Sequence, residues 1–282
     1  MPELPEVEIT TIALRQKLEN HSIKAIDIFQ PNLRYPLPAH LRQICLHQKI
    51  NSLTRHGKII LWHFANQAIL LWHLGMSGRW KIISPQQSKQ YKRVKHDHLT
   101  MVLDDDTHLF YHDPRRFGYC DYLDHIDSWN KHPKLFKLGP DALNFDLSSD
   151  AFHKSLSNKK TTIKRALLNQ QIIAGIGNIY ACEILWHSAI HPLSPCNHLT
   201  KPQTDQIIKA TQLVLKKAIQ SGGSSMRDFQ DPNGKLGYFA HQWSCYGQEN
   251  QKCTRNKCTG IIKKILDSGR STYYCAMHQK TM

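Results

Sequence analysis

The sequence predicts an α+β fold: an N-terminal β-sandwich with one leading helix, then a mainly helical region, then a C-terminal β-hairpin. Three observations predict it. From Ile23 to Tyr122, turn residues separate short β-like runs, namely IKAIDIF, KIILWHF, AILLWHL, HLTMVL and HLFYH. Helical periodicity then takes over in TTIKRALLNQ, NIYACEILWHSAI and TDQIIKATQLVLKKAIQ. Near the C-terminus, a β-like stretch lies between a pair of cysteines, Cys253 and Cys258, and a cysteine–histidine pair, Cys275 and His278.

The opening segment, MPELPEVE, predicts the first helix. Pro5 suits a first turn, where a missing amide hydrogen costs nothing, and the acids Glu6 and Glu8 suit the positive end of the helix dipole. We expect this helix to run to about Asn20.

Turn-forming residues mark the connection between the two halves of the chain. Pro133, Gly139 and Pro140 lie between the last β-like run and the first helical one. The predicted segments are an N-terminal β-sandwich domain (1–132), a linker (133–150), a helical domain (151–242) that includes a glycine-containing loop from Gly222 to Ala240, and a C-terminal module (243–282).

Positive charge is concentrated in the second half of the chain. Residues 1–150 carry 19 Lys and Arg against 16 Asp and Glu, whereas residues 151–282 carry 18 against 6. A basic half of this size predicts a polyanion as partner, because each cation that meets a phosphate releases a condensed counterion. A basic surface that serves only solubility is the alternative.

The composition argues against a membrane protein and against a disulfide scaffold. No apolar run approaches the ~20 residues of a membrane helix, and the start of the chain lacks the pattern of a secretory signal. We therefore expect a cytoplasmic protein. We also expect it to be a monomer. Eight cysteines are too sparse for a disulfide framework, and Cys45, Cys120 and Cys182 are expected to be small core residues.

The C-terminal cysteines and histidine predict a structural zinc site. Cys253, Cys258, Cys275 and His278 are spaced C-x4-C, x16, C-x2-H, which suits tetrahedral zinc held by two knuckles across a hairpin. A closed set of four ligands leaves no position for substrate water, so one structural ion is expected. Cys245 could replace Cys253, but its x12 distance from Cys258 makes a poor knuckle.

The N-terminus itself is a candidate nucleophile. Removal of Met1 would expose Pro2 as a secondary amine, and an α-amino group has a pKa near ~8, against ~10.4 for lysine. Attack of this amine on the C1′ atom of a sugar would give an iminium ion, and Glu3 beside it could move protons. The same segment could equally be a simple lead-in to the helix.

Seven motifs together resemble those of the formamidopyrimidine-DNA glycosylase family. They occur in the order of the family and extend along nearly the whole chain. The matching stretches are MPELPEVE, HLGMSG (73–78), KHDH (95–98), DPRRFG (113–118), GIGNIY (175–180), KLGYFA (235–240) and GRSTYYC (269–275).

The resemblance implies a base-excision-repair enzyme that removes oxidised purines from double-stranded DNA and then cleaves the strand. It implies Pro2 as the Schiff-base nucleophile, Glu3 as the acid/base, Lys58 as the proton donor in β-elimination and Arg270 in δ-elimination. Because arginine is a poor general acid, stabilisation of phosphate is the physically safer role for Arg270, at the tip of the predicted hairpin. Lys58 could otherwise be an ordinary cation at the start of a strand.

The resemblance also implies the groups that hold DNA once the damaged nucleotide has left the duplex. Met76, Arg115 and Phe117 would fill the gap, with Arg115 able to pair with the orphaned cytosine. The expected phosphate contacts are His73, His96 and Lys160. GIGNIY resembles a helix-two-turns-helix motif in which Asn178 caps a helix, and the loop from Gly222 to Ala240 resembles a lesion-capping segment.

The predicted zinc knuckles depart from the family pattern in two ways. The family usually has C-x2-C in both knuckles, whereas this chain has a wider first knuckle and ends in His278.

The related endonuclease VIII branch, which prefers oxidised pyrimidines, also begins with Pro-Glu, although DPRRFG and the long glycine loop favour the purine branch. A noncatalytic zinc-containing DNA-binding protein is the other alternative, but binding alone requires neither Pro2, Glu3 nor Lys58.

Overall fold

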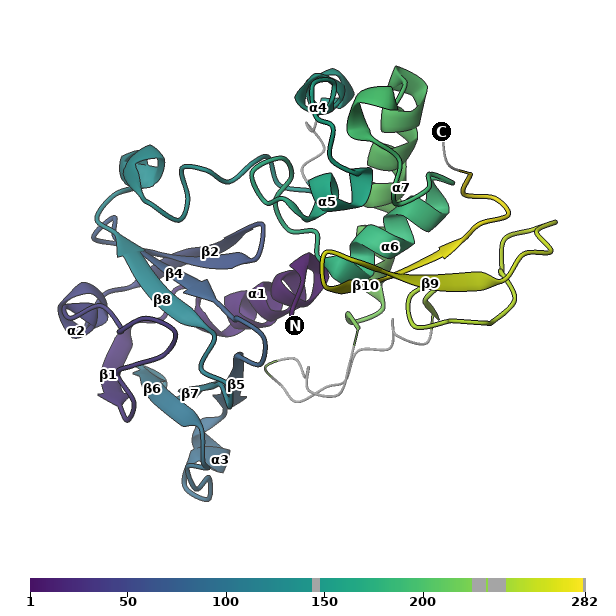
Figure 1. The fold of residues 1–282 in the computed structure, drawn as a ribbon. Coiled ribbons are helices and arrows are strands. Elements are labelled where there is room, and N and C mark those ends of the chain that lie inside the picture. Colours follow the sequence, from purple (N-terminus) through teal and green to yellow (C-terminus); the bar gives the residue numbers. More distant parts are fainter. Residues whose placement is uncertain (144–147, 225–231, 233–241, 281–282) are drawn as a thin grey trace. The chain divides into compact units, whose positions relative to one another are not determined.

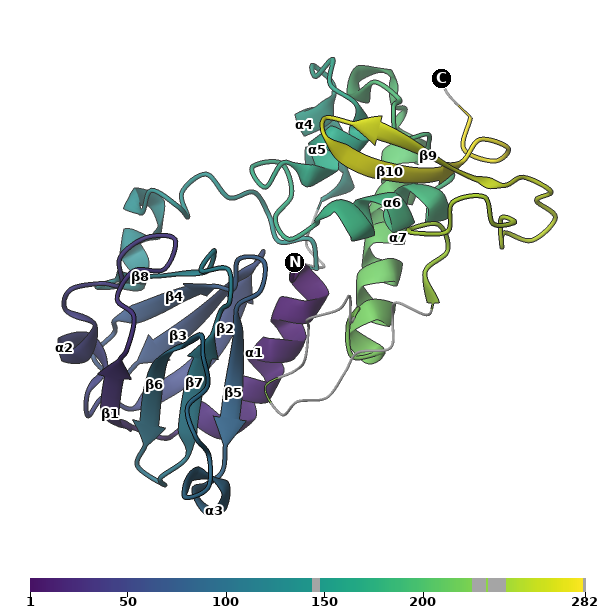
Figure 2. The same cartoon turned by 60° about the horizontal axis from the view of Figure 1, so that its bottom comes forward.

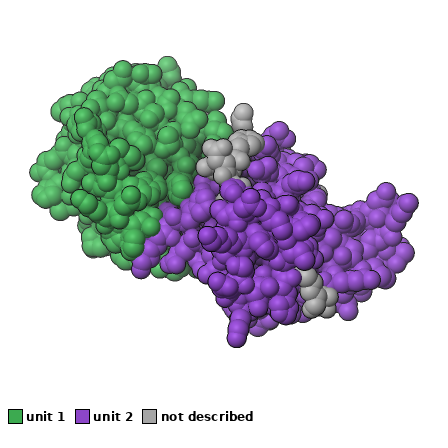
Figure 3. Space-filling view, turned by 90° about the horizontal axis from the view of Figure 1, so that it is seen from above, with its two compact units in different colours: residues 1–136, 222–238 green, residues 137–221, 239–282 purple. Residues whose placement is uncertain are grey.

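The computed structural model describes residues 1–143, 148–224, 232 and 242–280. The chain forms two compact units (Figure 3), Met1–Phe136 with Gly222–Tyr238 (unit 1) and Lys137–Ser221 with Phe239–Met282 (unit 2). The sequence-based boundaries differ from these units in three respects. The segment that begins at Gly222 belongs to unit 1 and not to the helical region, residues 137–150 of the expected linker belong to unit 2, and the expected C-terminal module (243–282) is part of unit 2.

Unit 1 contains two four-stranded antiparallel sheets, which confirms the predicted β-sandwich (Figures 1 and 2). The strand orders are β1-β6-β7-β5 and β2-β3-β4-β8. The strands are β1 (Ile23–Ile28), β2 (Ile50–His56), β3 (Ile59–Phe64), β4 (Ile69–His73), β5 (Arg79–Ile83), β6 (Asp97–Leu103), β7 (His108–His112) and β8 (Tyr119–Leu123).

Aromatic side chains from both sheets meet in the core of the sandwich. Trp62 and Trp72 come from one sheet, Trp80 and Tyr111 from the other, and all four are at most 1 % exposed. The ring centroids of Trp72 lie 4.8 Å from those of Trp80 and 5.0 Å from those of Tyr111. Such aromatic pairs each add about 0.5–1.5 kcal/mol beyond the burial of their area, so this cluster joins the two sheets.

Helix α1 (Leu4–Leu18) packs against β2, β3 and β5. Because β2 and β5 are edge strands of the two sheets, the helix covers one open side of the sandwich. Glu6 in its first turn and Arg15 and Lys17 in its last turn have the charges that the helix dipole favours. The predicted N-terminal helix is therefore confirmed.

Three short helices complete the part of unit 1 that the structure describes. Helix α2 (Leu41–Cys45) follows β1, helix α3 (Pro85–Ser88) follows β5, and the 3-10 helix η1 (Ile126–Lys131) follows β8. The cysteines expected to be core residues, Cys45 and Cys120, are buried here.

Unit 2 combines helices with a C-terminal hairpin. Helix α6 packs against α5, α7 and β10, and α4 packs against α7. The elements are α4 (Ser149–Leu156), α5 (Ile163–Leu168), α6 (Asn178–His187), the 3-10 helix η2 (Cys196–His198), α7 (Lys201–Gln220), β9 (Ile262–Asp267) and β10 (Arg270–Cys275). Among the described residues, no helix is both long enough and apolar enough to cross a membrane.

Candidate active site and metal centre

The N-terminal residues are held by a buried carboxylate. Pro2 is buried, and Glu3, the N-cap of α1, and Glu6 are each only 2 % exposed. Glu6 Oε2 accepts the amide of Glu3 at 2.9 Å, while Oε1 accepts the amide and the hydroxyl of Ser224, both at 2.8 Å. Glu6 therefore connects the start of the chain to the residues that open the Gly222–Ala240 loop.

Lys58 lies in the two-residue turn between β2 and β3. Gly57 has a φ of 57°, which suits the first position of a tight hairpin turn. Arg55 donates to Gly57 O at 3.0 Å and to Glu8 Oε2 on α1 at 2.5 Å. This largely buried ion pair attaches the turn with Lys58 to the first helix, and loss of one partner of such a pair costs about 3–5 kcal/mol.

His73 is a neutral hydrogen-bond donor rather than a cation. Burial, followed by the positive charges of Lys58 and Arg34, lowers the pKa of His73 to about 4. Its Nδ1 accepts the amide of Gly75 at 2.9 Å, which leaves the proton on Nε2. The ring stacks on that of Tyr119, with centroids 5.0 Å apart, so the orientation of the Nε2–H group is fixed.

The three predicted gap-filling side chains lie on two loops in contact with each other. Met76, between β4 and β5, is 37 % exposed, and Phe117, between β7 and β8, is 42 % exposed. The guanidinium carbon of Arg115 lies 4.8 Å from the centroid of the Phe117 ring. A Cβ on Gly75 would approach the Phe117 carbonyl carbon to 2.3 Å, so the two loops meet backbone to backbone. We call these two loops, residues 74–78 and 113–118, the platform.

Asp113 holds the platform together. Its carboxylate is fully buried and accepts the hydroxyl of Ser77 at 2.5 Å and the amide of Gly118 at 2.8 Å. The amide of Arg115 in turn donates to Ser77 Oγ at 3.2 Å. One carboxylate thus fixes both loops and the backbone of Arg115.

His96 and Lys160, the other expected phosphate contacts, lie on separate units. His96 in unit 1 is partly exposed and has a φ of 74°, and its carbonyl accepts the amide of Asp113 at 3.1 Å. Its ring lies 6.2 Å from that of His98 and 6.1 Å from that of His112. Lys160 in unit 2 is exposed in the segment between α4 and α5.

Arg270 is at the tip of the C-terminal hairpin, as expected. It is the first residue of β10 and pairs with Asp267 across a turn in which Ser268 and Gly269 both have positive φ values, 49° and 73°. This turn matches the twist of the two strands. Arg165 on α5 donates to Asp267 Oδ1 at 2.8 Å and so attaches the tip to the helices.

Two helical side chains hold the strand that follows Arg270. Lys164 on α5 is completely buried and donates to Thr272 Oγ1 at 2.6 Å. Asn178 on α6 donates from Nδ2 to Ser271 O at 2.9 Å. Because both partners directly follow Arg270, the two donors fix the backbone from which its guanidinium extends.

The prediction that Asn178 caps a helix is wrong. The N-cap of α6 is Gly177, and Asn178 is the first helical residue, whose amide group is directed to the hairpin instead. Gly175 has a φ of 110°, and Gln170 accepts its amide at 2.8 Å while donating to Ile176 O at 2.9 Å. Glycines and one glutamine side chain, not an asparagine cap, therefore form the turn before α6.

The expected lesion-capping segment lies mostly outside the described residues. Of the residues from Gly222 to Ala240, the structure describes Gly222, Gly223, Ser224 and Pro232. Pro232 O accepts the amide of Ile82 on β5 at 2.9 Å.

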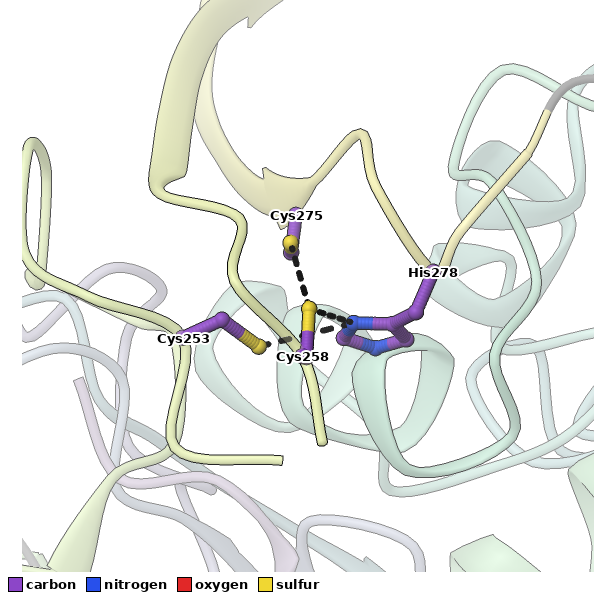
Figure 4. Close-up of side chains that lie close together, drawn as sticks. All are labelled: Cys253, Cys258, Cys275 and His278. Atoms are coloured by element: carbon purple, nitrogen blue, oxygen red, sulfur yellow. Dashed lines mark hydrogen bonds between the residues drawn. The ribbon is translucent and has the colours of Figure 1, made fainter. Parts of the chain in front are cut away.

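The four predicted metal ligands converge at one point (Figure 4). The ligand atoms of Cys253, Cys258, Cys275 and His278 all lie within 4.8 Å of one another. Cys258 Sγ lies 3.7 Å from Cys275 Sγ, and His278 Nδ1 lies 3.4 Å from Cys253 Sγ and 3.8 Å from Cys258 Sγ. A tetrahedral ion with bonds of about 2.3 Å to sulfur and 2.0–2.1 Å to nitrogen places its ligand atoms about 3.5–3.8 Å apart. The residues therefore fit a metal ion.

Two neighbouring groups, the carbonyl of Trp186 and the backbone of Gly260, help to position the four ligands. His278 Nε2 lies 3.2 Å from Trp186 O, the kind of second contact that orients a metal-binding imidazole. A Cβ on Gly260 would lie 2.6 Å from Cys275 Sγ, so a side chain there would displace a ligand.

Cys245 does not belong to the cluster. It is fully buried and its amide donates to Glu183 Oε1 at 2.9 Å. The same carboxylate accepts the amides of Ser244 at 2.9 Å and Tyr246 at 2.8 Å. Glu183 therefore anchors the start of the C-terminal module to α6, and the alternative ligand set with Cys245 in place of Cys253 is wrong for this structure.

Comparison with known proteins identifies the same architecture along the chain. The profile of the formamidopyrimidine-DNA glycosylase N-terminal domain matches residues 1–120, and that of the formamidopyrimidine-DNA glycosylase H2TH domain matches residues 138–230. The formamidopyrimidine-DNA glycosylases of Erythrobacter litoralis and Roseobacter denitrificans are 40 % and 37 % identical to the chain, and each alignment covers 99 % of this chain and all of the relative.

Solved structures give the same result. Lactococcus lactis Fpg in complex with DNA that contains an abasic site superposes with a TM-score of 0.88 at 31 % identity, over 99 % of this chain and all of the other. Its complexes with N7-benzyl-Fapy-dG DNA and with oxidised-pyrimidine DNA give TM-scores of 0.88 and 0.87, with the same identity and coverage.

The sandwich, the helical unit and the cysteine–histidine hairpin thus define a base-excision-repair DNA glycosylase that acts on damaged double-stranded DNA. The chain belongs to the formamidopyrimidine-DNA glycosylase family.

Sequence reasoning missed the buried groups that position the expected ones. Glu6 and Asp113 lie inside the quoted motifs, and Lys164 and Glu183 lie inside the predicted helices; the structure adds that each is a buried group that positions its neighbours. A signal for Lys164 was present, because Ile163, Ala166 and Leu167 place it within a run of apolar residues.

Proposed function

We propose that this enzyme excises oxidised purines, such as 8-oxoguanine and formamidopyrimidines, and cleaves the strand by β,δ-elimination through an imine on Pro2. The observation that carries the proposal is the N-terminus itself, where Pro2 and the buried acid Glu3 are adjacent at the cap of α1. The complexes of Lactococcus lactis Fpg with N7-benzyl-Fapy-dG DNA and abasic DNA support these substrates.

Pro2 supplies the nucleophile once Met1 has been removed. Its nitrogen lone pair attacks C1′ as the bond from C1′ to the base breaks, and the amine proton is lost. The C1′–O4′ bond then breaks with protonation of O4′, and the iminium that forms makes the C2′ proton acidic. Loss of this proton expels the 3′ phosphate, and a second elimination expels the 5′ phosphate. Glu3 carries protons, Lys58 serves the first elimination, and Arg270 stabilises phosphate in the second.

The geometry of each unit supports the proposed DNA contacts. Met76, Arg115 and Phe117 would fill the gap left by the flipped nucleotide, and His73 would donate its fixed Nε2–H to a phosphate as a neutral group. Lys160 and Asn178 complete the proposed contacts on the basic unit 2, with Asn178 acting through the hairpin backbone.

We also propose that the Cys3His cluster holds one structural zinc ion. Three thiolates and an imidazole suit Zn²⁺, and four protein ligands leave no open position for chemistry. When bound, the ion would fix the ends of the hairpin that carries Arg270. We further infer that the protein is monomeric and acts in the cytoplasm.

Borohydride trapping on three duplexes tests the proposed function. We expect the protein to form a permanent adduct with duplexes that bear 8-oxoguanine or an abasic site, and to react more slowly with thymine glycol. A stronger reaction with thymine glycol would assign the chain to oxidised pyrimidines, a possibility raised by the oxidised-pyrimidine complex of the Lactococcus lactis protein. Binding without any adduct would indicate a noncatalytic DNA-binding protein.

Glu3→Gln should separate the two chemical steps. We expect excision of 8-oxoguanine to fall by about 10²–10⁴-fold, the usual contribution of an acid/base group, while nicking of a preformed abasic site stays close to normal. Gel assays on the two duplexes measure both rates, and Glu19→Gln, at the other end of α1, is the matched control. Equal losses on both substrates would assign Glu3 to folding or to the elimination steps.

Arg115→Ala should change the reading of the opposite base more than the affinity for DNA. A guanidinium that reads base acceptors discriminates by about 1–3 kcal/mol, so the preference for cytosine should fall by roughly 5–150-fold. Excision assays against the four opposite bases measure it. Phe117→Ala is a suitable comparison, because it removes the ring beside Arg115 but no hydrogen-bond donor; an unchanged preference in Arg115→Ala would refute the assignment.

A further inference from the structure

The loop between α3 and β6 is rich in exposed cations. In residues 89–96, which we call the basic loop, the exposed side chains include Lys89, Lys92, Arg93 and Lys95. The sequence from Ile82 to His96 contains no Asp or Glu. Within the part of the chain that the structure describes, no ion pair joins any of these four cations to a carboxylate. Exposed cations in such number are available to an external polyanion.

The buried carboxylate of Asp97 holds the basic loop in place. Its oxygens accept Tyr91 Oη at 2.8 Å, the amide of Val94 at 3.1 Å, Lys81 Nζ at 2.8 Å and a ring nitrogen of His112 at 2.8 Å. Burial alone would raise the pKa of Asp97, but these hydrogen bonds hold the pKa well below its usual range. The carboxylate therefore stays charged at neutral pH, and the loop has a defined conformation.

The basic loop adjoins the platform that carries the gap-filling residues. The amide of Asp113 donates to His96 O at 3.1 Å, and a ring nitrogen of His98 lies 2.7 Å from Asp113 O. The guanidinium carbon of Arg93 lies 4.3 Å from the centroid of the Phe29 ring, which is itself exposed. One residue, Asp113, thus connects the loop to both loops of the platform.

We propose that Lys92, Arg93 and Lys95 form an auxiliary surface that binds the phosphates of duplex DNA beside the lesion. This inference rests on the proposed role of Met76, Arg115 and Phe117, because DNA that receives these side chains must continue past the platform. Duplex DNA carries one charge per about 1.7 Å of its axis, so DNA that passes the loop offers several phosphates.

The test measures how binding depends on salt and on duplex length. The triple variant Lys92→Ala, Arg93→Ala, Lys95→Ala is compared with wild type for binding to duplexes of about 11 and 25 base pairs that carry a central abasic-site analogue. Each lost phosphate contact should reduce the slope of log K against log salt by about 0.9. With the long duplex we expect the slope to fall by about 2 to 3 and the affinity at low salt to fall at least tenfold; with the short duplex the change should be small.

The matched control removes three other exposed cations of unit 1. The variant Lys17→Ala, Lys49→Ala, Lys131→Ala has the same net charge as the triple variant of the basic loop and should keep a slope within about one unit of the wild type on both duplexes. Thermal unfolding midpoints close to the wild type would show that both variants fold, and single-turnover excision at saturating protein should be unchanged in the control variant.

Three results would overturn the inference. The first is an unchanged slope in the basic-loop variant, which would leave these cations available for an acidic protein instead of DNA. The second is an equal fall in the control, which would reduce the effect to net charge. The third is an equal loss on both duplexes, which would place the contacts at the lesion rather than beside it. Failure of the proposed function is seen separately, as absence of trapping by the wild-type protein.

Discussion

An N-terminal extension that is not cleaved should abolish both strand cleavage and borohydride trapping, while DNA binding is retained. In the extended chain, the nitrogen of Pro2 belongs to an amide, whose lone pair is delocalised into the carbonyl and cannot attack C1′. Loss of the nucleophile should lower the rate on 8-oxoguanine DNA by roughly 10³-fold or more. Gel assays of nicking and of the trapped adduct measure the effect.

The same extension joined through a protease site is the matched control, because cleavage before Pro2 should restore the activity. Pro2→Gly, which keeps a primary amine, should retain part of the trapping. If the uncleaved protein acts at the normal rate and is still trapped, the nucleophile lies elsewhere, and Lys58 is the next candidate because its turn is attached to α1.

Cys275→Ser should remove the metal and disorder the C-terminal hairpin. Structural zinc sites contribute on the order of 10 kcal/mol of apparent binding free energy, which here would be available to fold β9 and β10. We expect the zinc content to fall from one ion per chain to near zero, and strand cleavage to fall at least 100-fold as Arg270 loses its support. Metal analysis and cleavage assays measure the two effects.

Cys245→Ser is the control for this experiment. Cys245 is a buried cysteine of the same module, yet it lies outside the four-ligand cluster, so this variant should keep its zinc. Wild-type zinc content in Cys275→Ser, or loss of zinc in Cys245→Ser, would contradict the ligand set.

Much of the fold could be predicted because its elements have clear periodicity. The five named apolar runs coincide with β1, β3, β4, β6 and β7; two of the helical stretches contain α5 and α6, and the third covers α7 from Thr204 to its end. Strand β2 gives a weaker signal because its buried residues, Ile50 and Leu53, are three apart rather than alternating. Helix α4 begins at Ser149, inside the predicted linker, and has only two buried residues, Phe152 and Leu156.

The site was less predictable, since spacing along the chain does not reveal which polar groups become buried. Motifs indicated Met76, Arg115 and Phe117, but not that the carboxylate of Asp113 fixes their loops. Asn178 illustrates the limit: asparagine beside glycine suggests a cap, yet its actual partner is 93 residues away, in the hairpin.

Helix α6 connects the strand that carries Arg270 to the cysteine–histidine cluster. At its first residue, Asn178 donates a hydrogen bond to Ser271, next to Arg270. Near its last residue, the carbonyl of Trp186 lies 3.2 Å from Nε2 of His278. The ten residues of α6 span about 15 Å, and the hydrogen bonds of the helix backbone keep this length nearly constant. An ion bound by His278 would therefore influence the position of the Arg270 guanidinium through α6, although Arg270 is not one of its ligands.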